Sequence, residues 1–342
     1  MKIWGLCFIG FGNVGQGLAR ILVREEEKLY HKWGFKFKTL AVVGRTKGAC
    51  MNPEGISLQA LLNRLDRGES IGTDFISPLE AVRLSGVDIV IDVTPTNLTT
   101  GEPGLSITRA ALNEGKHVIS SNKGPVSLAF HELQKLASDK RCEYRFEGTV
   151  MSGTPAINLA LESMAGCEFY EIQGIVNGTT NYILTRMEEG LEYDVALKEA
   201  QDLGYAETNP EGDVDGWDAA VKAQIIANVI MRNTIPLSKV TRKGIAGLSR
   251  KNIQAAKSKG AKIKLLAHIQ RTSDGVLASV APVELPLSHP LAGVDGATNA
   301  ITYNTNNIKN VTIIGPGAGR EETGQALLSD MLSIVAHEQV LF

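Results

Sequence analysis

An aspartate and a lysine four residues apart are the side chains in this sequence best suited to move a proton. Asp218 and Lys222 stand in the segment DGWDAAVKAQI, and residues four apart on a helix project from the same face. An acidic and a basic group on one face can share a small ligand. An alcohol that gives up hydride must also lose its hydroxyl proton, which a neutral lysine can accept. The spacing alone also fits an exposed helical ion pair, which contributes only about 0.3–0.5 kcal/mol.

A glycine-rich turn near the N-terminus has the form of a dinucleotide-binding motif. It is the GxGxxG sequence Gly10-Phe11-Gly12-Asn13-Val14-Gly15, which follows a short apolar strand at 3–9 and opens a helix. The glycines allow a tight turn and a close approach of the backbone to a pyrophosphate, whose charge is stabilised by the helix N-terminus. GxGxxG alone is weak evidence, but its position between a strand and a helix predicts nucleotide binding.

An arginine after the second predicted strand bears on which nicotinamide cofactor is used. An NAD-preferring site usually carries Asp or Glu there, whereas this chain reads Val43-Gly44-Arg45-Thr46-Lys47. Arg45 can hold a 2′-phosphate, which favours NADP. This alignment requires the charged stretch 24–38 to be an insertion. The alternative is that Arg45 is a solvated surface residue.

The first half of the chain alternates strands with helices, which predicts an α/β fold with a Rossmann-type doubly wound parallel sheet. The expected strands are 3–9, 39–43, 87–94 and 116–121, and the expected helices are 18–28, 105–114 and 126–138. Ligands of such sheets bind at the carboxyl ends of the strands. The glycine-rich turn lies at that edge.

After Glu147 the pattern changes, which predicts a second, α+β catalytic and dimerisation domain. A strand at 171–178 and helices at 194–203 and 215–231 precede alternating segments at 263–270, 277–285 and 298–305, which are typical of an antiparallel sheet. We expect residues 1–147 plus 310–342 to form the dinucleotide-binding domain. Residues 148–309 are expected to bind substrate and to dimerise.

The composition excludes several other functions. The 342 residues carry a formal net charge of −2, so no basic surface for nucleic acid is expected. No signal peptide and no apolar run of about 18 residues is present, which predicts a cytoplasmic protein without a membrane partner. The four cysteines, Cys7, Cys50, Cys142 and Cys167, are scattered and form no CxxC pair. They are expected to be free thiols rather than zinc ligands or disulfides.

Six segments, in order and spanning nearly the whole chain, resemble homoserine dehydrogenase. They are SNKGP (121–125), EGTVMSGTPAIN (147–158), GIVNGTTNYIL (174–184), LGYAETNPEGDVDGWDAAVKAQI (203–225), HPLAGVDGATNAI (289–301) and GPGAG (315–319). The resemblance implies an NAD(P)-dependent oxidoreductase of threonine, methionine and isoleucine biosynthesis, which interconverts L-homoserine and L-aspartate 4-semialdehyde by hydride transfer. The chain ends soon after its last helix, so a short form without the C-terminal regulatory domain, and without strong threonine inhibition, is expected.

The resemblance also implies roles for residues around the substrate. Lys222 is the expected acid/base, and Lys123 has a second catalytic or electrostatic role beside cofactor and substrate. Carboxylates suit the substrate ammonium group, and Glu207 and Asp218 match the substrate carboxylates, with Asp213 and Tyr205 in the same shell. The N–H groups at Gly178 and Thr179 suit the substrate carboxylate, although an ordinary helix cap explains that segment equally well.

Further cofactor contacts and an ion site are implied in the same way. The expected cofactor contacts beyond the glycine-rich turn are Thr94, Pro95, Thr96, Lys123, Gly204 and Gly315. The stretch after GPGAG, 320–324, departs from the commonest family wording. Some members bind a monovalent cation, Na⁺ or K⁺, through backbone carbonyls that correspond here to Glu147, Val150, Ser152 and Thr154. The resemblance and the antiparallel sheet together suggest a homodimer.

Two alternatives remain open. A semialdehyde dehydrogenase that forms a thioester needs an activated cysteine beside a base, and no cysteine here has such a setting by sequence. A non-catalytic NADP-binding regulator can share the fold, because a fold does not determine a function. The set of Glu207, Asp218, Lys222 and Lys123 argues against a regulator, which needs no substrate shell.

Overall fold

The chain forms two compact units. The computed structural model describes residues 2–340, apart from the side chain at position 340. Unit 1 comprises Met1–Gly153 and Gly319–Phe342, and unit 2 comprises Thr154–Ala318. Among the described residues, no helix has the length and the apolar content that crossing a bilayer requires.

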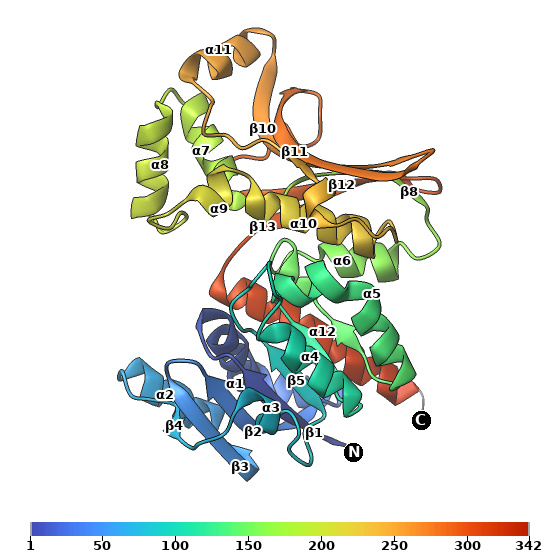
Figure 1. Cartoon of the computed structure of the whole chain (residues 1–342). Helices are drawn as coiled ribbons and strands as arrows, with labels where there is room; N and C mark the ends of the chain where they lie inside the picture. Colours follow the sequence, from blue (N-terminus) through green and yellow to red (C-terminus); the bar gives the residue numbers. More distant parts are fainter. Residues whose placement is uncertain (1, 341–342) are drawn as a thin grey trace. The chain divides into compact units, whose positions relative to one another are not determined.

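Unit 1 is built on a seven-stranded sheet in the order β4-β3-β2-β1-β5-β6-β7 (Figure 1). The strands are β1 (Ile3–Ile9), β2 (Lys36–Gly44), β3 (Gly48–Ile56), β4 (Gly72–Thr73), β5 (Ile89–Asp92), β6 (His117–Ser120) and β7 (Tyr144–Arg145). All neighbours pair in parallel except β2 and β3. The chain runs outward from β1 in one direction and then returns to place β5 on its other side. The ends of β1 and β5 therefore form the switch point at which such sheets bind ligands.

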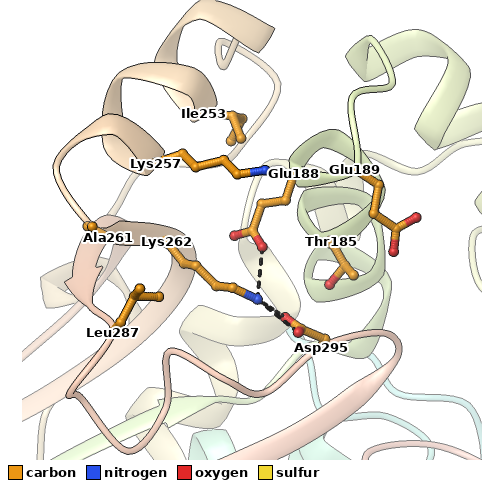
Figure 2. A pocket seen from close by; sticks show the side chains of 10 residues that line it. Thr185, Glu188, Glu189, Ile253, Lys257, Ala261, Lys262, Leu287 and Asp295 are labelled. Carbon is orange, nitrogen blue, oxygen red and sulfur yellow. Dashed lines mark hydrogen bonds and ion pairs between the residues drawn. The ribbon is translucent and has the colours of Figure 1, made fainter.

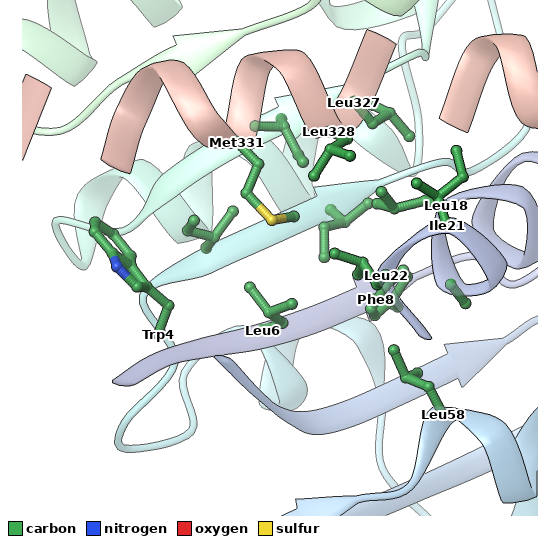
Figure 3. Close-up of a cluster of buried hydrophobic side chains, with 14 of the residues drawn as sticks. Trp4, Leu6, Phe8, Leu18, Ile21, Leu22, Leu58, Leu327, Leu328 and Met331 are labelled. Carbon is green, nitrogen blue, oxygen red and sulfur yellow. The ribbon is translucent and has the colours of Figure 1, made fainter. Parts of the chain in front are cut away.

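Helices enclose this sheet. They are α1 (Asn13–Trp33), α2 (Leu58–Asp66), α3 (Pro78–Ala81), α4 (Gly104–Asn113), α5 (Lys123–Asp139) and α12 (Arg320–Val340). One face of β1, formed by Trp4, Leu6 and Phe8, packs against apolar side chains of α1, α2 and α12 (Figure 3). Alternate residues of a strand share one face, so this single apolar row joins the last helix of the chain to the first strand.

Helix α1 is longer than the sequence pattern predicts. The charged stretch 24–38, which the alignment of Arg45 requires to be an insertion, continues α1 as far as Trp33 and then forms the start of β2. Its glutamates and lysines are good helix formers, and Leu29 remains buried against the core. The helix ends at Gly34, whose φ of 60° suits glycine. Strand β3 was not predicted, because its middle residues, 51–54, are exposed and include a proline, which disfavours strands.

Unit 2 contains a six-stranded sheet in the order β13-β12-β8-β10-β11-β9. The strands are β8 (Phe169–Ile175), β9 (Thr241–Arg242), β10 (Ala261–Thr272), β11 (Gly275–Pro286), β12 (Thr298–Thr305) and β13 (Lys309–Pro316). All pairs are antiparallel except β9 with β11. Because β13 pairs with β12, the chain returns to unit 1 after Ala318 rather than at the expected residue 310.

The helices of unit 2 carry most of the polar residues singled out above. They are α6 (Ala156–Asn158), α7 (Gly178–Glu188), α8 (Tyr193–Asp202), α9 (Glu211–Val214), α10 (Trp217–Val229) and α11 (Arg250–Ser258). Helix α10 is buried from Ala219 to Val229 and contacts β10 and β11. A helix that is apolar on nearly all sides is a core helix. Lys222 in its middle is therefore an exception that needs an explanation.

Candidate active site

The glycine-rich turn of unit 1 leaves room for a ligand at the N-terminus of α1. Gly10 has a φ of 95°, and a Cβ there would lie 2.6 Å from the carbonyl oxygen of Val93, so a side chain is excluded. A Cβ at Gly12 would meet nothing within 4 Å, and no side chain caps the helix. There is thus open space beside Gly12, at the start of α1. The first N–H groups of α1 can bind a pyrophosphate, as the motif predicts.

The loops after β5 and β6 are joined by side-chain hydrogen bonds. Oδ1 of Asp92 accepts from the backbone N–H and the hydroxyl of Thr94, at 3.0 and 2.6 Å. The Thr94 hydroxyl oxygen accepts from Nδ2 of Asn122 at 2.9 Å, and the N–H of Lys123 donates to Oγ1 of Thr96 at 3.3 Å. Three of the predicted residues, Thr94, Thr96 and Lys123, are therefore brought together at the carboxyl edge of the sheet.

Asp92 holds this arrangement and was not predicted. It is fully buried at the end of β5, and burial raises the pKa of its carboxyl to about 6 against the hydrogen bonds from Thr94. Its Oδ2 has no partner among the described residues. An acidic residue at the end of an otherwise apolar strand was a usable signal, because an unpaired buried carboxylate is costly.

Arg45 lies in the tight turn between β2 and β3. The turn spans residues 45–47, and Arg45 is exposed. Within residues 2–340 its guanidinium has no acidic partner. The position beyond the end of β2 suits a contact with the ribose of a dinucleotide.

In unit 2, Lys222 and Asp218 form the ion pair that their spacing predicts. Lys222 is only 8% exposed, and its Nζ lies 2.7 Å from Oδ2 of Asp218. The same ammonium donates to the carbonyl oxygen of Val176 at 2.7 Å. The pair is therefore not the exposed helical ion pair of the alternative interpretation. Among residues 2–340 two acceptors take two of the three N–H groups of Lys222, and the third is available for a ligand.

Asp213 is connected to this pair through Asn177, and Thr179 is connected to Tyr205. Nδ2 of Asn177 donates to Asp213 at 2.7 Å and to Asp218 at 3.0 Å. Burial raises the pKa of Asp213, and nearby Asp218 raises it further. The hydroxyl of Thr179 donates to the carbonyl oxygen of Tyr205 at 2.7 Å.

The remaining predicted residues of unit 2 are less closely connected. Glu207 is exposed, and no described hydrogen bond or ion pair joins its carboxylate to this cluster. Gly204 ends α8 with a φ of 76°, and Gly315 lies in β13, where a Cβ would stand 2.2 Å from Oγ1 of Thr154. The backbone conformation at Gly204 and the close packing at Gly315 therefore each explain why glycine occupies the position, without a cofactor contact. Gly178 begins α7 behind the Asn177 cap, so the cap interpretation of this segment also holds.

The stretch 147–154 has an unusual backbone. Met151 and Ser152 both have positive φ angles, 59° and 54°, which are rare for residues with side chains. The hydroxyl of Ser152 lies 2.7 Å from that of Thr323, and the N–H of Glu147 donates to Asp330 at 2.8 Å. Strained backbone of this kind often marks a binding site. Among the described residues no cluster of His, Cys, Asp and Glu could hold a metal ion, so only carbonyl oxygens come into question here.

The cysteines are free thiols, and two of them are chemically passive. Burial raises the pKa of Cys7 to about 12 and that of Cys142 to about 11. A thiol with so high a pKa is a poor nucleophile at neutral pH. This argues against the thioester-forming alternative.

A separate cavity of unit 2, about 360 Å³ in volume, contains none of these residues. Figure 2 shows Lys262 in this cavity, paired with Glu188 at 3.1 Å and with Asp295 at 2.8 Å. Its lining residues are Thr185, Glu188, Glu189, Ile253, Lys257, Gly260, Ala261, Lys262, Leu287 and Asp295. Its acidic and basic groups largely pair with each other, so it does not compete with the Lys222 cluster as the reaction site.

Comparison with known proteins decides the family. Residues 155–332 match the family model described as homoserine dehydrogenase, and residues 10–147 match that of the homoserine dehydrogenase NAD-binding domain. The chain belongs to the homoserine dehydrogenase family. An NAD(+)-dependent homoserine dehydrogenase of Pseudomonas canavaninivorans is 39% identical over 98% of this chain and 97% of its own length.

Solved structures agree. A putative homoserine dehydrogenase from Archaeoglobus fulgidus has a TM-score of 0.88 and 37% identity, and the match covers 97% of this chain and 99% of that one. A hyperthermophilic archaeal homoserine dehydrogenase in complex with NADPH has a TM-score of 0.83 and 28% identity, with 98% of both chains covered. The predicted α/β fold with a Rossmann-type sheet and the predicted oxidoreductase activity are confirmed. The chain is an NAD(P)-dependent homoserine dehydrogenase.

Proposed function

We propose that Lys222 is the acid/base of the reaction between L-homoserine and L-aspartate 4-semialdehyde. The observation that carries this proposal is the buried ammonium with two protein acceptors and one N–H group left over. A bound nicotinamide would supply the hydride acceptor, and in the oxidation the hydroxyl proton of homoserine passes to neutral Lys222. In the reduction, the Lys222 ammonium donates that proton to the aldehyde oxygen. Atoms and charge balance with one proton released on oxidation.

The two ends of the substrate have complementary groups in unit 2. Its ammonium group suits Asp218, Asp213 and Glu207, with Tyr205 alongside, because carboxylates form strong hydrogen bonds with ammonium. Its carboxylate suits the N–H groups of Gly178 and Thr179 in the first turn of α7, where the helix leaves donors without intrahelical partners. Both roles are proposals for these residues.

The cofactor supplies the hydride acceptor when it is bound. The open N-terminus of α1 beyond Gly12 fits its pyrophosphate. Phe11, Asn13, Val14 and Gly15 complete the turn, and Thr94, Pro95, Thr96 and Lys123 suit the nicotinamide end. Gly204 and Gly315 are further proposed contacts. Arg45 favours NADP over NAD, while the relatives named above include an NAD(+)-dependent enzyme and an NADPH complex.

Ion binding, assembly and domain roles are also proposed. The strained backbone at Met151 and Ser152 supports a Na⁺ or K⁺ site on the carbonyls of Glu147, Val150, Ser152 and Thr154. We propose a cytoplasmic homodimer joined through the antiparallel sheets of unit 2, with unit 1 binding the dinucleotide. Light scattering tests the dimer, and a mass near 36.7 kDa would overturn it.

The decisive experiment follows reduced-nicotinamide absorbance with purified protein, L-homoserine, and NADP or NAD in parallel. Homoserine-dependent reduction is expected with wild type and is expected to vanish with Lys222→Ala, while cofactor affinity stays nearly intact. Equal loss of turnover and of cofactor affinity would make Lys222 a structural residue. Absence of reduction with wild type and either cofactor would favour a non-catalytic regulator.

A further inference from the structure

The side chain of Asn177 lies at the centre of the acidic cluster in unit 2. It immediately precedes α7 and is 5% exposed. Its amide nitrogen has two hydrogens, and each points to a different carboxylate. One goes to Oδ1 of Asp213 at 2.7 Å, and the other goes to Oδ2 of Asp218 at 3.0 Å.

The other end of the same amide caps helix α7. Oδ1 of Asn177 accepts from the backbone N–H of Thr180 at 2.9 Å, and the hydroxyl of Thr180 lies 2.9 Å from the same oxygen. An asparagine amide has two donors and two acceptor lone pairs. Both donors and the oxygen are therefore used. The two donors fix the side chain more firmly than a helix cap requires, since a cap uses only the oxygen.

We propose that Asn177 is a positioning residue for the reaction, whose amide holds Asp213 and Asp218 side by side as carboxylates and so sets the orientation of Lys222. This rests on the proposed role of Lys222. The chain of contacts is short, because Oδ2 of Asp218 accepts from both Asn177 and Lys222. In addition, Lys222 donates to the carbonyl oxygen of Val176, the residue before Asn177.

An amide is the appropriate group at this point for electrostatic reasons. The charged groups that face it are Asp213 from α9, and Asp218 and Lys222 from α10. Two carboxylates close together favour protonation of one of them. Burial raises the pKa of Asp213, and the hydrogen bond from Asn177 opposes that rise. The amide thus favours the ionised form of Asp213, which is the form that suits a substrate ammonium group.

Two substitutions separate this role from helix capping. Asp and Ser are both good N-cap residues, so Asn177→Asp and Asn177→Ser each keep an acceptor for the first turn of α7. Neither can donate to both carboxylates. For Asn177→Ser we expect the KM for L-homoserine to rise about tenfold, because hydrogen bonds to charged groups are lost, with cofactor affinity unchanged within about twofold.

Asn177→Asp adds a third carboxylate and has a further, diagnostic effect. The added negative charge opposes the loss of a proton from the reaction site, so the pH at half-maximal rate of homoserine oxidation should move up by about one unit. The efficiency kcat/KM for homoserine should fall about 100-fold. If this variant does not fold, Asn177→Ser decides the matter alone.

A matched control lies one turn along the same helix. Asn181 is 1% exposed and donates to the carbonyl oxygens of Val294, Gly296 and Thr298. Asn181→Asp should lower the unfolding midpoint and leave the pH profile of turnover in place. A fall in unfolding midpoint alone for both Asn177 variants, with KM and pH profile unchanged, would overturn the proposal.

A measurement independent of activity separates this proposal from the function on which it rests. Carboxyl NMR titration should show Asp213 titrating at higher pH in Asn177→Ser than in wild type, because its hydrogen-bond donor is missing. An inactive wild type would contradict the role of Lys222. An unchanged titration of Asp213 would contradict the role of Asn177 whatever the activity.

Discussion

Two buried lysines of unit 2 have nearly the same surroundings and differ by one acceptor. Lys264 is fully buried, and its Nζ donates to the carbonyl oxygen of Val294 at 2.7 Å, to Asp295 at 2.9 Å and to Oδ1 of Asn181 at 3.3 Å. Lys222 has one backbone carbonyl and one carboxylate within the described residues. An ammonium group has three N–H donors.

The difference separates a structural lysine from a reactive one. All three donors of Lys264 are satisfied by the protein, so a ligand has nothing to gain there. Within the described residues, Lys222 has one N–H donor without an acceptor. An unsatisfied donor in a buried site costs free energy, and a substrate oxygen that accepts from it would remove this cost. Burial itself does not distinguish them. The number of protein acceptors does.

The largest expected effect is on turnover in Lys222→Ala. Loss of the acid/base should lower kcat for homoserine oxidation about 10³-fold, since general acid–base catalysis contributes about 10²–10⁴-fold. The Kd of NADPH, measured by its nicotinamide fluorescence, should change less than about twofold. A variant that keeps more than about a tenth of the wild-type kcat would refute the assignment.

Lys264→Met is expected to show the opposite pattern. The variant loses the hydrogen bonds to Val294 and Asn181, while Asp295 is 43% exposed and keeps Lys262, so the unfolding free energy in urea should fall by about 2 kcal/mol. Turnover per folded molecule should stay within about threefold of wild type. If kcat instead fell as far as in Lys222→Ala, a lysine with three protein acceptors could also be essential for turnover. The number of acceptors would then not distinguish a structural lysine from a reactive one.

Arg45 extends the comparison to an exposed cation without a protein partner. If it binds a 2′-phosphate, Arg45→Ala should raise the KM for NADP about tenfold, because a charge-assisted hydrogen bond of this kind contributes about 1.4 kcal/mol. The KM for NAD should not change. Arg83→Ala, at another exposed position of unit 1, serves as the control. Equal losses with both cofactors would remove the argument for NADP preference.

Most of the fold could be predicted because its strands are strongly apolar. Strand β1 was predicted at its observed bounds, and β12 likewise, since uninterrupted or alternating apolar residues are a strong signal. Strand β3 was missed because residues 51–54 are exposed and include Asn52, Pro53 and Glu54, which are rare in strands. The true extent of α1 was missed because its last turns carry charges where a loop was expected. Polar stretches have no periodicity from which to predict an element.

The site residues that belong to a local motif could be predicted from the sequence. Those that are brought in by contacts between distant segments could not. The Asp218 and Lys222 pair follows from helical spacing. In contrast, Val176 and Asn177 lie more than forty residues from Lys222 and Asp218, and no local pattern pairs them. Asp92 could have been identified as an acid in a buried strand, but its bonds to Thr94 depend on the tertiary fold.

The smallest expected effect concerns the buried carboxyl of Asp92. Like the ammonium of Lys222, it has one polar atom or N–H group without a hydrogen-bond partner among the described residues. Oδ2 of Asp92 has no partner among the described residues, and burial raises the pKa of the carboxyl to about 6 from a model-compound value of 3.8. A carboxyl with a raised pKa binds its proton more tightly in the folded state than in the unfolded state. Its contribution to stability is therefore present at low pH and is lost as the pH rises towards 6.

Asp92→Asn should remove this pH dependence. Between about pH 5 and about pH 8, the wild type should lose about 1 kcal/mol of unfolding free energy through this carboxyl, and the variant should not. Urea unfolding of both proteins at the two pH values measures the difference, and the other titrating groups cancel in the comparison. An identical pH dependence in both proteins would mean that Oδ2 of Asp92 has a hydrogen-bond partner in solution. The comparison between Asp92 and Lys222 would then be wrong.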